Sequence, residues 1–127
     1  MTASWTIKRV PEKGLVEVTT KGTVTVAESD QMIQEIVALK LDPDKDRILV
    51  DHRAAVTQFS TMELYELPQT YQIVQAAARF WVATVFQEIR PDEEFYVQMC
   101  RTRGLTRIEI FTDYDAALRW LTSPERR

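Results

Sequence analysis

The fold is decided by the stretch RILVDHR at positions 47–53. Its centre, Ile48-Leu49-Val50, is continuously apolar and rich in branched side chains, a pattern typical of a central strand that is covered on both faces. Asp51 stands at the carboxyl end of this predicted strand, where open α/β sheets commonly place ligands. The segments on both sides must therefore supply neighbouring strands and covering helices.

The residues that precede this strand predict a hairpin. Trp5–Val10 and Leu15–Thr20 have strand-like composition, and the loop between them ends in Gly14, which can adopt a positive φ. Gly22 is expected to let the chain turn after the hairpin. A short third strand after this glycine is compatible with the sequence.

A capping box then marks the start of a helix. Thr25 and Glu28 have the spacing at which a hydroxyl and a carboxylate satisfy the free amides of a first helical turn. The helix should begin at Val26, and it should end before Pro43, because the residue before a proline avoids the helical region.

The chain beyond the central strand predicts a second crossover. Ser60 and Glu63 have the spacing of another capping box, and Pro68 should break the helix that is expected from residue 61 to about 77. Phe80–Phe86 is rich in aromatic and β-branched residues and predicts a buried strand.

A third helix is bounded by proline and glycine. Pro91 opens it and Gly104 follows it, with acidic residues in its first turn and arginines in its last. If Gly104 forms a left-handed cap, Cys100 and Leu105 should pack together in a Schellman motif. This favours a buried apolar role for the cysteine over a reactive one.

The last segments predict one more strand and one more helix. Residues 107–111 alternate, with Ile108 and Ile110 on one face, and Thr112 with Asp115 is expected to cap the final helix. Residues 1–127 thus predict a single α/β domain with a mixed, largely parallel sheet of about 4–6 strands and about four helices.

Composition limits the kinds of function. The net charge of -3 does not favour nucleic acid, which attracts clustered cations. A single cysteine cannot form an internal disulfide, and this favours a reducing, cytoplasmic location. No apolar run reaches the length of a membrane span, and Met1–Trp5 lacks the pattern of a secretory signal.

The chain resembles the STAS family, in its stand-alone bacterial branch similar to sporulation anti-sigma-factor antagonists. The resemblance rests on KGTVT at 21–25, RILVDHR at 47–53 and IFTDYDAALRWL at 110–121. It implies a non-catalytic regulatory or protein-interaction module.

In such relatives a serine after the central strand is phosphorylated. Here the matching stretch, AAVTQFST at 54–61, keeps hydroxyls but lacks the usual acidic residue and glycine. The candidate phosphoacceptors are Ser60, Thr61 and Thr57.

The sequence contains two other candidate sites. Asp51, His52 and Arg53 form a potential acid, base and cation trio, but neighbouring residues of a strand point to opposite faces, and this argues against an enzyme. Core packing is the usual role of the aromatic residues in the second half of the chain, and the alternative is a pocket for an apolar ligand, a use that Sec14-type lipid-binding domains make of the STAS-like fold. The candidate lining residues of this pocket are Phe80, Trp81, Phe86, Phe95, Tyr96 and Met99.

Two functions remain open from the sequence. The first is a protein-interaction module, including self-association as a homodimer, and the alternative is a binding protein or sensor for a small hydrophobic ligand. No cofactor is expected. One histidine and one cysteine, without suitably spaced carboxylates, also predict no metal site.

Overall fold

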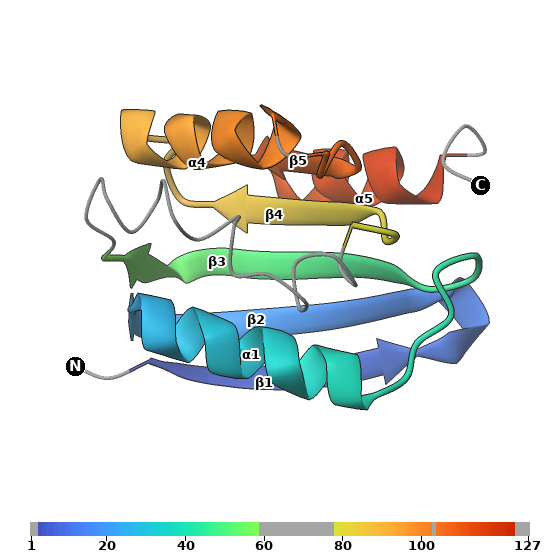
Figure 1. Cartoon of the computed structure of the whole chain (residues 1–127). Coiled ribbons are helices and arrows are strands. Elements are labelled where there is room, and N and C mark those ends of the chain that lie inside the picture. Colours follow the sequence, from blue (N-terminus) through green and yellow to red (C-terminus); the bar gives the residue numbers. More distant parts are fainter. Residues whose placement is uncertain (1–2, 59–77, 103, 124–127) are drawn as a thin grey trace.

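The computed structural model describes residues 3–58, 78–102 and 104–123. Within them five strands form one sheet in the order β1-β2-β3-β4-β5, so that each strand lies beside its neighbour in the sequence (Figure 1). The strands are β1 (Ser4–Val10), β2 (Leu15–Val24), β3 (Arg47–Thr57), β4 (Val82–Phe86) and β5 (Ile108–Phe111). Only β1 and β2 pair antiparallel, and the sheet is therefore mixed and largely parallel, as predicted.

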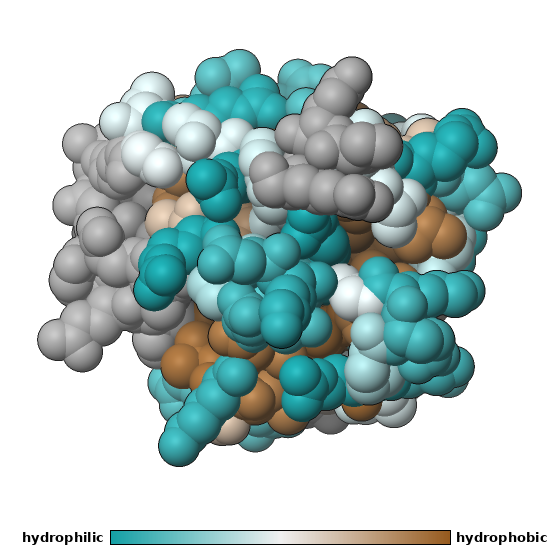
Figure 2. Space-filling view, turned by 90° about the vertical axis from the view of Figure 1, so that its right-hand side faces the viewer, coloured by the Kyte–Doolittle hydropathy of each residue, from teal (hydrophilic) through white to brown (hydrophobic). Residues whose placement is uncertain are grey.

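The predicted hairpin joins β1 to β2 through a short 3-10 turn, η1 (Pro11–Lys13). Gly14 follows the turn with a φ of 60°, and a Cβ atom at this position would lie 2.5 Å from the backbone oxygen of Lys45. Glycine is therefore required both by the backbone conformation and by the close approach of the α1–β3 connection. Figure 2 shows the molecule from the end where the β1–β2 turn lies, and the surface there is a mixture of hydrophilic and hydrophobic areas.

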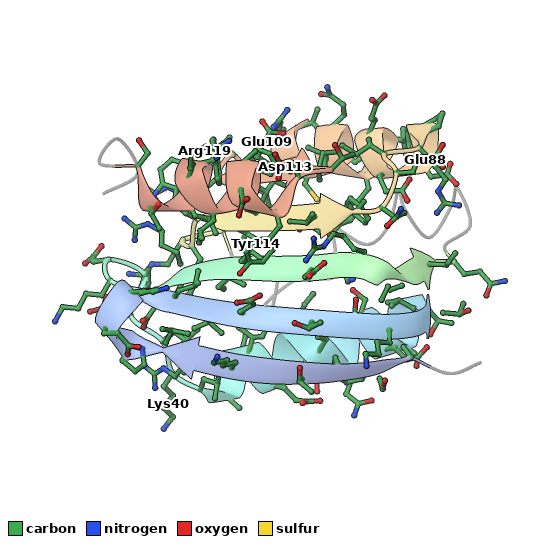
Figure 3. All side chains as sticks on the ribbon, turned by 180° about the vertical axis from the view of Figure 1, so that it is seen from behind. Lys40, Glu88, Glu109, Asp113, Tyr114 and Arg119 are labelled. Carbon is green, nitrogen blue, oxygen red and sulfur yellow. The ribbon has the colours of Figure 1, made fainter. Side chains whose placement is uncertain are left out.

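Three α-helices cover the sheet in the described part of the chain. They are α1 (Val26–Ala38), α4 (Pro91–Thr102) and α5 (Tyr114–Thr122). α1 lies in front of the sheet in Figure 1, and α5 lies in front of it when the molecule is seen from behind (Figure 3). The two helices therefore cover opposite faces.

The core is divided between these two faces because side chains alternate along each strand. On the α5 face, six fully or almost fully buried residues form one cluster: Leu15, Leu49, Ala83, Val85, Ala117 and Leu121. On the α1 face a smaller buried cluster contains Val18, Val24 and Met32. β3 contributes to both sides, as its continuous apolar run predicts.

Two helix ends agree with the sequence prediction in detail. The Oγ1 of Thr25 accepts a hydrogen bond from the backbone N–H of Glu28, whose carboxylate accepts from the Thr25 N–H, so the capping box is confirmed. At the end of α4, Gly104 has a φ of 91°, and the N–H of Leu105 donates to the Cys100 carbonyl at 3.0 Å. This is the predicted Schellman motif, and both Leu105 and Cys100 are buried.

Two strand boundaries were predicted wrongly. β2 continues through Gly22 to Val24, because this glycine keeps its place in the ladder opposite Ala55 with a φ of 84°. β3 continues beyond Asp51 to Thr57, so Asp51 lies in the middle of the strand and not at its carboxyl end.

The start of α5 also differs from the prediction. Its N-cap is Asp113 and not Thr112, since the Oδ1 of Asp113 accepts a hydrogen bond from the N–H of Asp115 at 3.0 Å. The expected broken helix over residues 61–77, with its capping box at Ser60, falls outside the described residues.

Candidate functional site

A cavity of about 410 Å³ lies between the sheet and the two helices α1 and α4. Its floor consists of alternate residues of the three consecutive strands β3, β4 and β5. These floor residues are Ile48, Val50, His52, Val82, Thr84, Phe86, Ile108 and Ile110. The period of two along each strand brings residues from distant parts of the sequence onto one surface.

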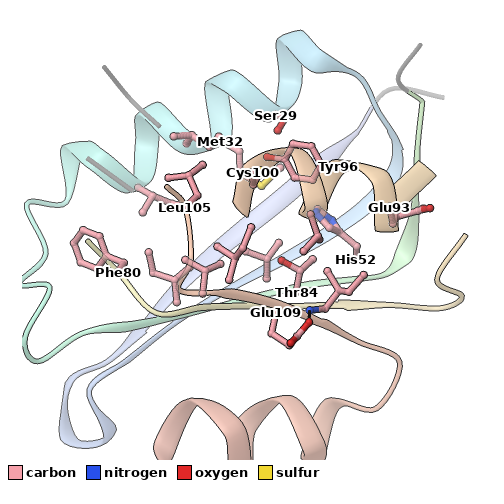
Figure 4. A pocket seen from close by; sticks show the side chains of 18 of the residues that line it. Ser29, Met32, His52, Phe80, Thr84, Glu93, Tyr96, Cys100, Leu105 and Glu109 are labelled. Atoms are coloured by element: carbon pink, nitrogen blue, oxygen red, sulfur yellow. Dashed lines mark hydrogen bonds between the residues drawn. The ribbon is translucent and has the colours of Figure 1, made fainter. Parts of the chain in front are cut away.

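The walls of the cavity come mainly from the two helices (Figure 4). α1 contributes Met32 and Ile36, and α4 contributes Tyr96 and Cys100. Leu105, which closes the Schellman motif, lines the same cavity. The lining is mostly apolar with a few polar groups, which is the usual composition of a small-molecule site.

His52 is a titratable group on the floor of the cavity, which Glu109 of β5 also lines. Its Nδ1 is hydrogen-bonded to the Oγ1 of Thr20, and its ring stacks on Phe86 with 5.5 Å between the ring centroids. Desolvation by the surrounding protein lowers the pKa of His52 to about 4, although the nearby carboxylates of Asp51 and Glu93 act in the opposite direction. The imidazole is therefore neutral at physiological pH.

A bulge in the sheet fixes the position of this histidine. Thr19 pairs with Asp51 and Lys21 pairs with Ala54, so Thr20 alone stands opposite two residues of β3, His52 and Arg53. Bulges of this kind redirect side chains and often occur beside functional sites.

Asp51 and Arg53 lie on the α5 face, away from the cavity. The Nε and Nη2 of Arg53 donate to the two carboxylate oxygens of Asp51 at 3.0 and 2.8 Å, and the guanidinium lies over the ring of Tyr114. Burial would raise the pKa of Asp51, but the hydrogen bonds from Arg53 outweigh it and lower the pKa. The hydroxyl of Tyr114 in turn donates to Glu17, and this network joins α5 to the sheet.

The potential trio is therefore divided between two faces of the sheet. His52 lines the cavity, whereas Asp51 and Arg53 form a structural ion pair on the other side. The three side chains do not converge on one point, so this arrangement cannot act as a joint acid, base and cation site.

The predicted pocket residues are only partly brought together. Tyr96, Phe80 and Phe86 line the cavity. Trp81 instead packs on the α5 face, where it meets Trp120 edge to face. Phe95 is 37% exposed and lines a more open depression between α4 and the edge strand β5. Met99 is partly buried in the same helix and is not among the described residues of the cavity wall.

The candidate phosphoacceptors are not placed as a group. Thr57 is the last residue of β3, and Ser60 and Thr61 fall outside the described residues. The phosphorylation switch stays a prediction.

Residues that the sequence analysis did not single out complete the site. Thr20 holds His52, Met32 lines the wall, and Thr84 lies in the middle of the floor. The alternation of Thr20 with Val16 and Val18 was the available signal, since it places the hydroxyl on the inner face of β2.

The described ranges lack two further features. No group of three or more histidine, cysteine or acidic side chains there is arranged to hold a metal ion. None of the described helices combines the length and the apolar character that a membrane span requires.

The fold is of the SpoIIAA-like type, which confirms the predicted STAS-like architecture. Among the solved structures that match is an uncharacterized protein from the DUF3478 family, with a SpoIIAA-like fold, from Shewanella loihica PV-4. The superposition has a TM-score of 0.60 at 16% sequence identity and covers 94% of this chain and 93% of that chain. No family model matches the sequence, and no curated protein matches it significantly. The similarity therefore establishes the fold, and the function has to be argued from the site.

Proposed function

We propose that the protein binds one small hydrophobic molecule in the cavity between α1, α4 and the sheet, as a non-catalytic carrier or sensor. The observation that supports this is the cavity itself, whose volume of about 410 Å³ is within the range typical of small-molecule sites. The single cysteine and the absence of a disulfide are consistent with action in the cytoplasm.

The wall of the cavity favours an apolar ligand over a charged one. Aliphatic and aromatic side chains of β3, β4, β5, α1 and α4 supply most of its surface. An apolar molecule that enters such a site is removed from water and is stabilised by roughly 25 cal/mol per Å² of buried surface. The one imidazole on the floor is neutral, and the charged lining residues carry both signs, so the cavity has no excess of cations that would attract an anion. These charged residues are Lys40, Arg79, Asp92, Glu93 and Glu109.

Binding of a neutral fluorescent probe, N-phenylnaphthylamine, tests this function. The wild-type protein should bind it saturably with one site per chain, and Thr84→Phe should weaken the affinity by at least about tenfold, because the ring fills the middle of the floor. Thr6→Phe, on the exposed side of the edge strand β1, is the matched control and should bind like the wild type.

Thermal unfolding of both variants shows whether they are folded. Native mass spectrometry of the protein purified gently from its own cells should then show an added mass that Thr84→Phe loses. Probe binding that is unsaturable, or that is equally strong in the folded Thr84→Phe variant, would exclude this cavity as the site.

A second candidate is a regulatory module that associates with a protein partner or with a second copy of itself. The exposed outer half of β3 favours it. β4 pairs with β3 only as far as His52, and beyond this point Val56 has an exposed fraction of 58%. An apolar side chain on a strand that extends past its neighbour is a feature of surfaces that receive another chain.

Light scattering over a range of concentrations tests self-association. If the outer half of β3 is the contact, Val56→Lys should shift the protein toward the monomer, whereas Val37→Lys, at an exposed valine of α1, should not. A wild-type protein that is monomeric throughout, together with affinity capture that yields only background proteins, would contradict this second function.

A further inference from the structure

We propose that the ligand of this cavity is a neutral, elongated apolar molecule with a hydroxyl group that donates a hydrogen bond to Nε2 of His52. The inference rests on the proposed binding function and specifies the class of ligand. Its physical basis is the hydrogen-bond arrangement around His52 and the distribution of charge along the cavity.

Thr20 determines which nitrogen of His52 carries the proton. The Oγ1 of Thr20 lies within hydrogen-bonding distance of both the Asp51 carbonyl oxygen, at 3.2 Å, and Nδ1 of His52. The carbonyl can only accept, and a threonine hydroxyl has one proton to donate. Both bonds form together only if Thr20 donates to Asp51 and accepts from a protonated Nδ1. Nε2 of the neutral ring is then an acceptor.

Nε2 has no hydrogen bond to any of the residues that the structure describes. The ring is held from one side by Thr20 and from another by the stack on Phe86, and it lies below α4 in the cavity (Figure 4). The side chain of His52 is half-buried, and an acceptor that is removed from water without gaining a partner costs more free energy than a hydrogen bond returns. A ligand that brings a donor to this atom would remove that cost.

The charges around His52 disfavour a carboxylate or phosphate at this position. The carboxylate of Glu93, on α4, lines the cavity near His52, and Asp51, the preceding residue of β3, adds negative charge from the other face of the sheet. Arg90 is bonded to Glu93, at 2.9 Å from Nη2 to Oε1, which places that cation in an ion pair. The pKa of His52 near 4 keeps the ring itself uncharged. A neutral donor therefore fits better than an anion.

The length of the cavity favours an extended molecule. His52 pairs with Phe86 at the carboxyl end of β4, whereas Arg79, Phe80 and Lys40 line the cavity near the opposite end of that strand. The four residue steps from Val82 to Phe86 alone span about 13 Å. A hydrocarbon chain with a terminal hydroxyl can follow the floor over this distance.

Three ligands with the same chain test the proposal: dodecanol, dodecyl methyl ether and dodecanoate. Titration calorimetry on the wild-type protein should give about tenfold tighter binding of the alcohol than of the ether, because only the alcohol can donate a hydrogen bond. Dodecanoate should bind more weakly than the alcohol. In His52→Phe, which keeps an aromatic ring next to Phe86, the alcohol and the ether should bind equally.

The outcomes separate the two levels of the argument. If neither the alcohol nor the ether binds, the proposed function itself fails. If both bind equally to the wild type, if dodecanoate binds most tightly, or if the preference for the alcohol persists in His52→Phe, the cavity binds apolar molecules but the role of His52 is wrong.

A measurement on the free protein keeps the proposal testable even if His52→Phe does not fold. His52 is the chain's only histidine, so the ¹⁵N signals of its ring need no assignment among residues. They should show a protonated Nδ1 and an unprotonated Nε2 at neutral pH. In Thr20→Val the preference for this tautomer should decrease, and the preference for the alcohol should decrease with it. A ring protonated at Nε2 in the wild type would overturn the proposal.

Discussion

At the scale of single residues, the environment of His52 decides what the cavity can recognise. The same imidazole in water would be partly charged near neutral pH, and it would then attract carboxylates and repel cations. Desolvation on the floor of the cavity removes that charge, and the bond with Thr20 fixes the proton on one nitrogen. A residue that seemed from the sequence to belong to a charged trio therefore acts as a neutral acceptor.

The shifted pKa of His52 predicts a loss of stability in mild acid. Its folded-state value of about 4 lies below the ordinary 6.5, so between these values the unfolded chain binds a proton that the folded chain does not. The free energy of unfolding should therefore be highest above pH 6.5 and should fall by roughly 3 kcal/mol as the pH decreases to about 4.

Urea unfolding, followed by the fluorescence of the three tryptophans, measures this dependence. His52→Gln, which retains a hydrogen-bonding side chain but does not titrate, is the control. Its stability should vary much less over the same pH interval. An equal loss in both proteins would assign the acid sensitivity to groups other than His52. Asp51 is not one of them, because its pKa is lowered and its contribution is lost only at still lower pH.

At the scale of elements, local signals predicted the helices better than the ends of the strands. The capping box at Thr25 and the glycine stop at Gly104 satisfy backbone groups within a few residues, so the sequence alone contains the whole interaction. The outer half of β3 could not be predicted in this way. Each of its residues pairs with a residue of β2 that lies more than thirty positions away in the sequence, as Ala54 does with Lys21.

The candidate site was predictable only in part for the same reason. The aromatic residues around β4 and α4 were evident from the sequence. Whether each of them faces the cavity depends on the side of the strand or helix on which it lies. Trp81 precedes β4 and packs on the α5 face, whereas Phe80 next to it lines the cavity. The contact between Thr20 and His52 spans the bulge in the sheet, and no local pattern contains it.

The cap of α5 gives a prediction at this scale, with a matched control one residue away. Asp113→Ala should lower the free energy of unfolding by about 1 kcal/mol, because the N–H of Asp115 loses its acceptor and the helix amino terminus loses a favourable charge. Thr112→Ala should change it little, since this exposed residue is not the cap. Chemical denaturation of both variants measures these changes. A larger loss of stability for Thr112→Ala than for Asp113→Ala would identify Thr112 as the N-cap, as the sequence analysis predicted.

At the scale of the whole molecule, the two faces of the sheet are packed differently. The α5 face carries the cluster of Leu15, Leu49, Val85 and Leu121, all at most 4% exposed. The other face includes the cavity, where floor residues such as Val82 remain partly exposed. Stability is therefore expected to come mainly from one face, while the opposite face supplies the binding site.

Two valines of the same strand test this division. Val85→Ala should cost about 2 kcal/mol, because it removes two buried carbon atoms from a close-packed cluster and leaves a void. Val82→Ala should cost about 1 kcal/mol or less, because its side chain already borders open space. Denaturant unfolding measures both, and equal losses would mean that the two faces are packed equally well.

The order of the strands has a consequence for synthesis on the ribosome. Each strand lies beside the one made just before it, so every new strand can pair as soon as it emerges. α5, however, is made after all five strands, and it alone among the described helices covers Leu49 and Val85. A nascent chain that already has its complete sheet therefore still exposes its main apolar face. We expect this to be the stage at which a chaperone is most needed.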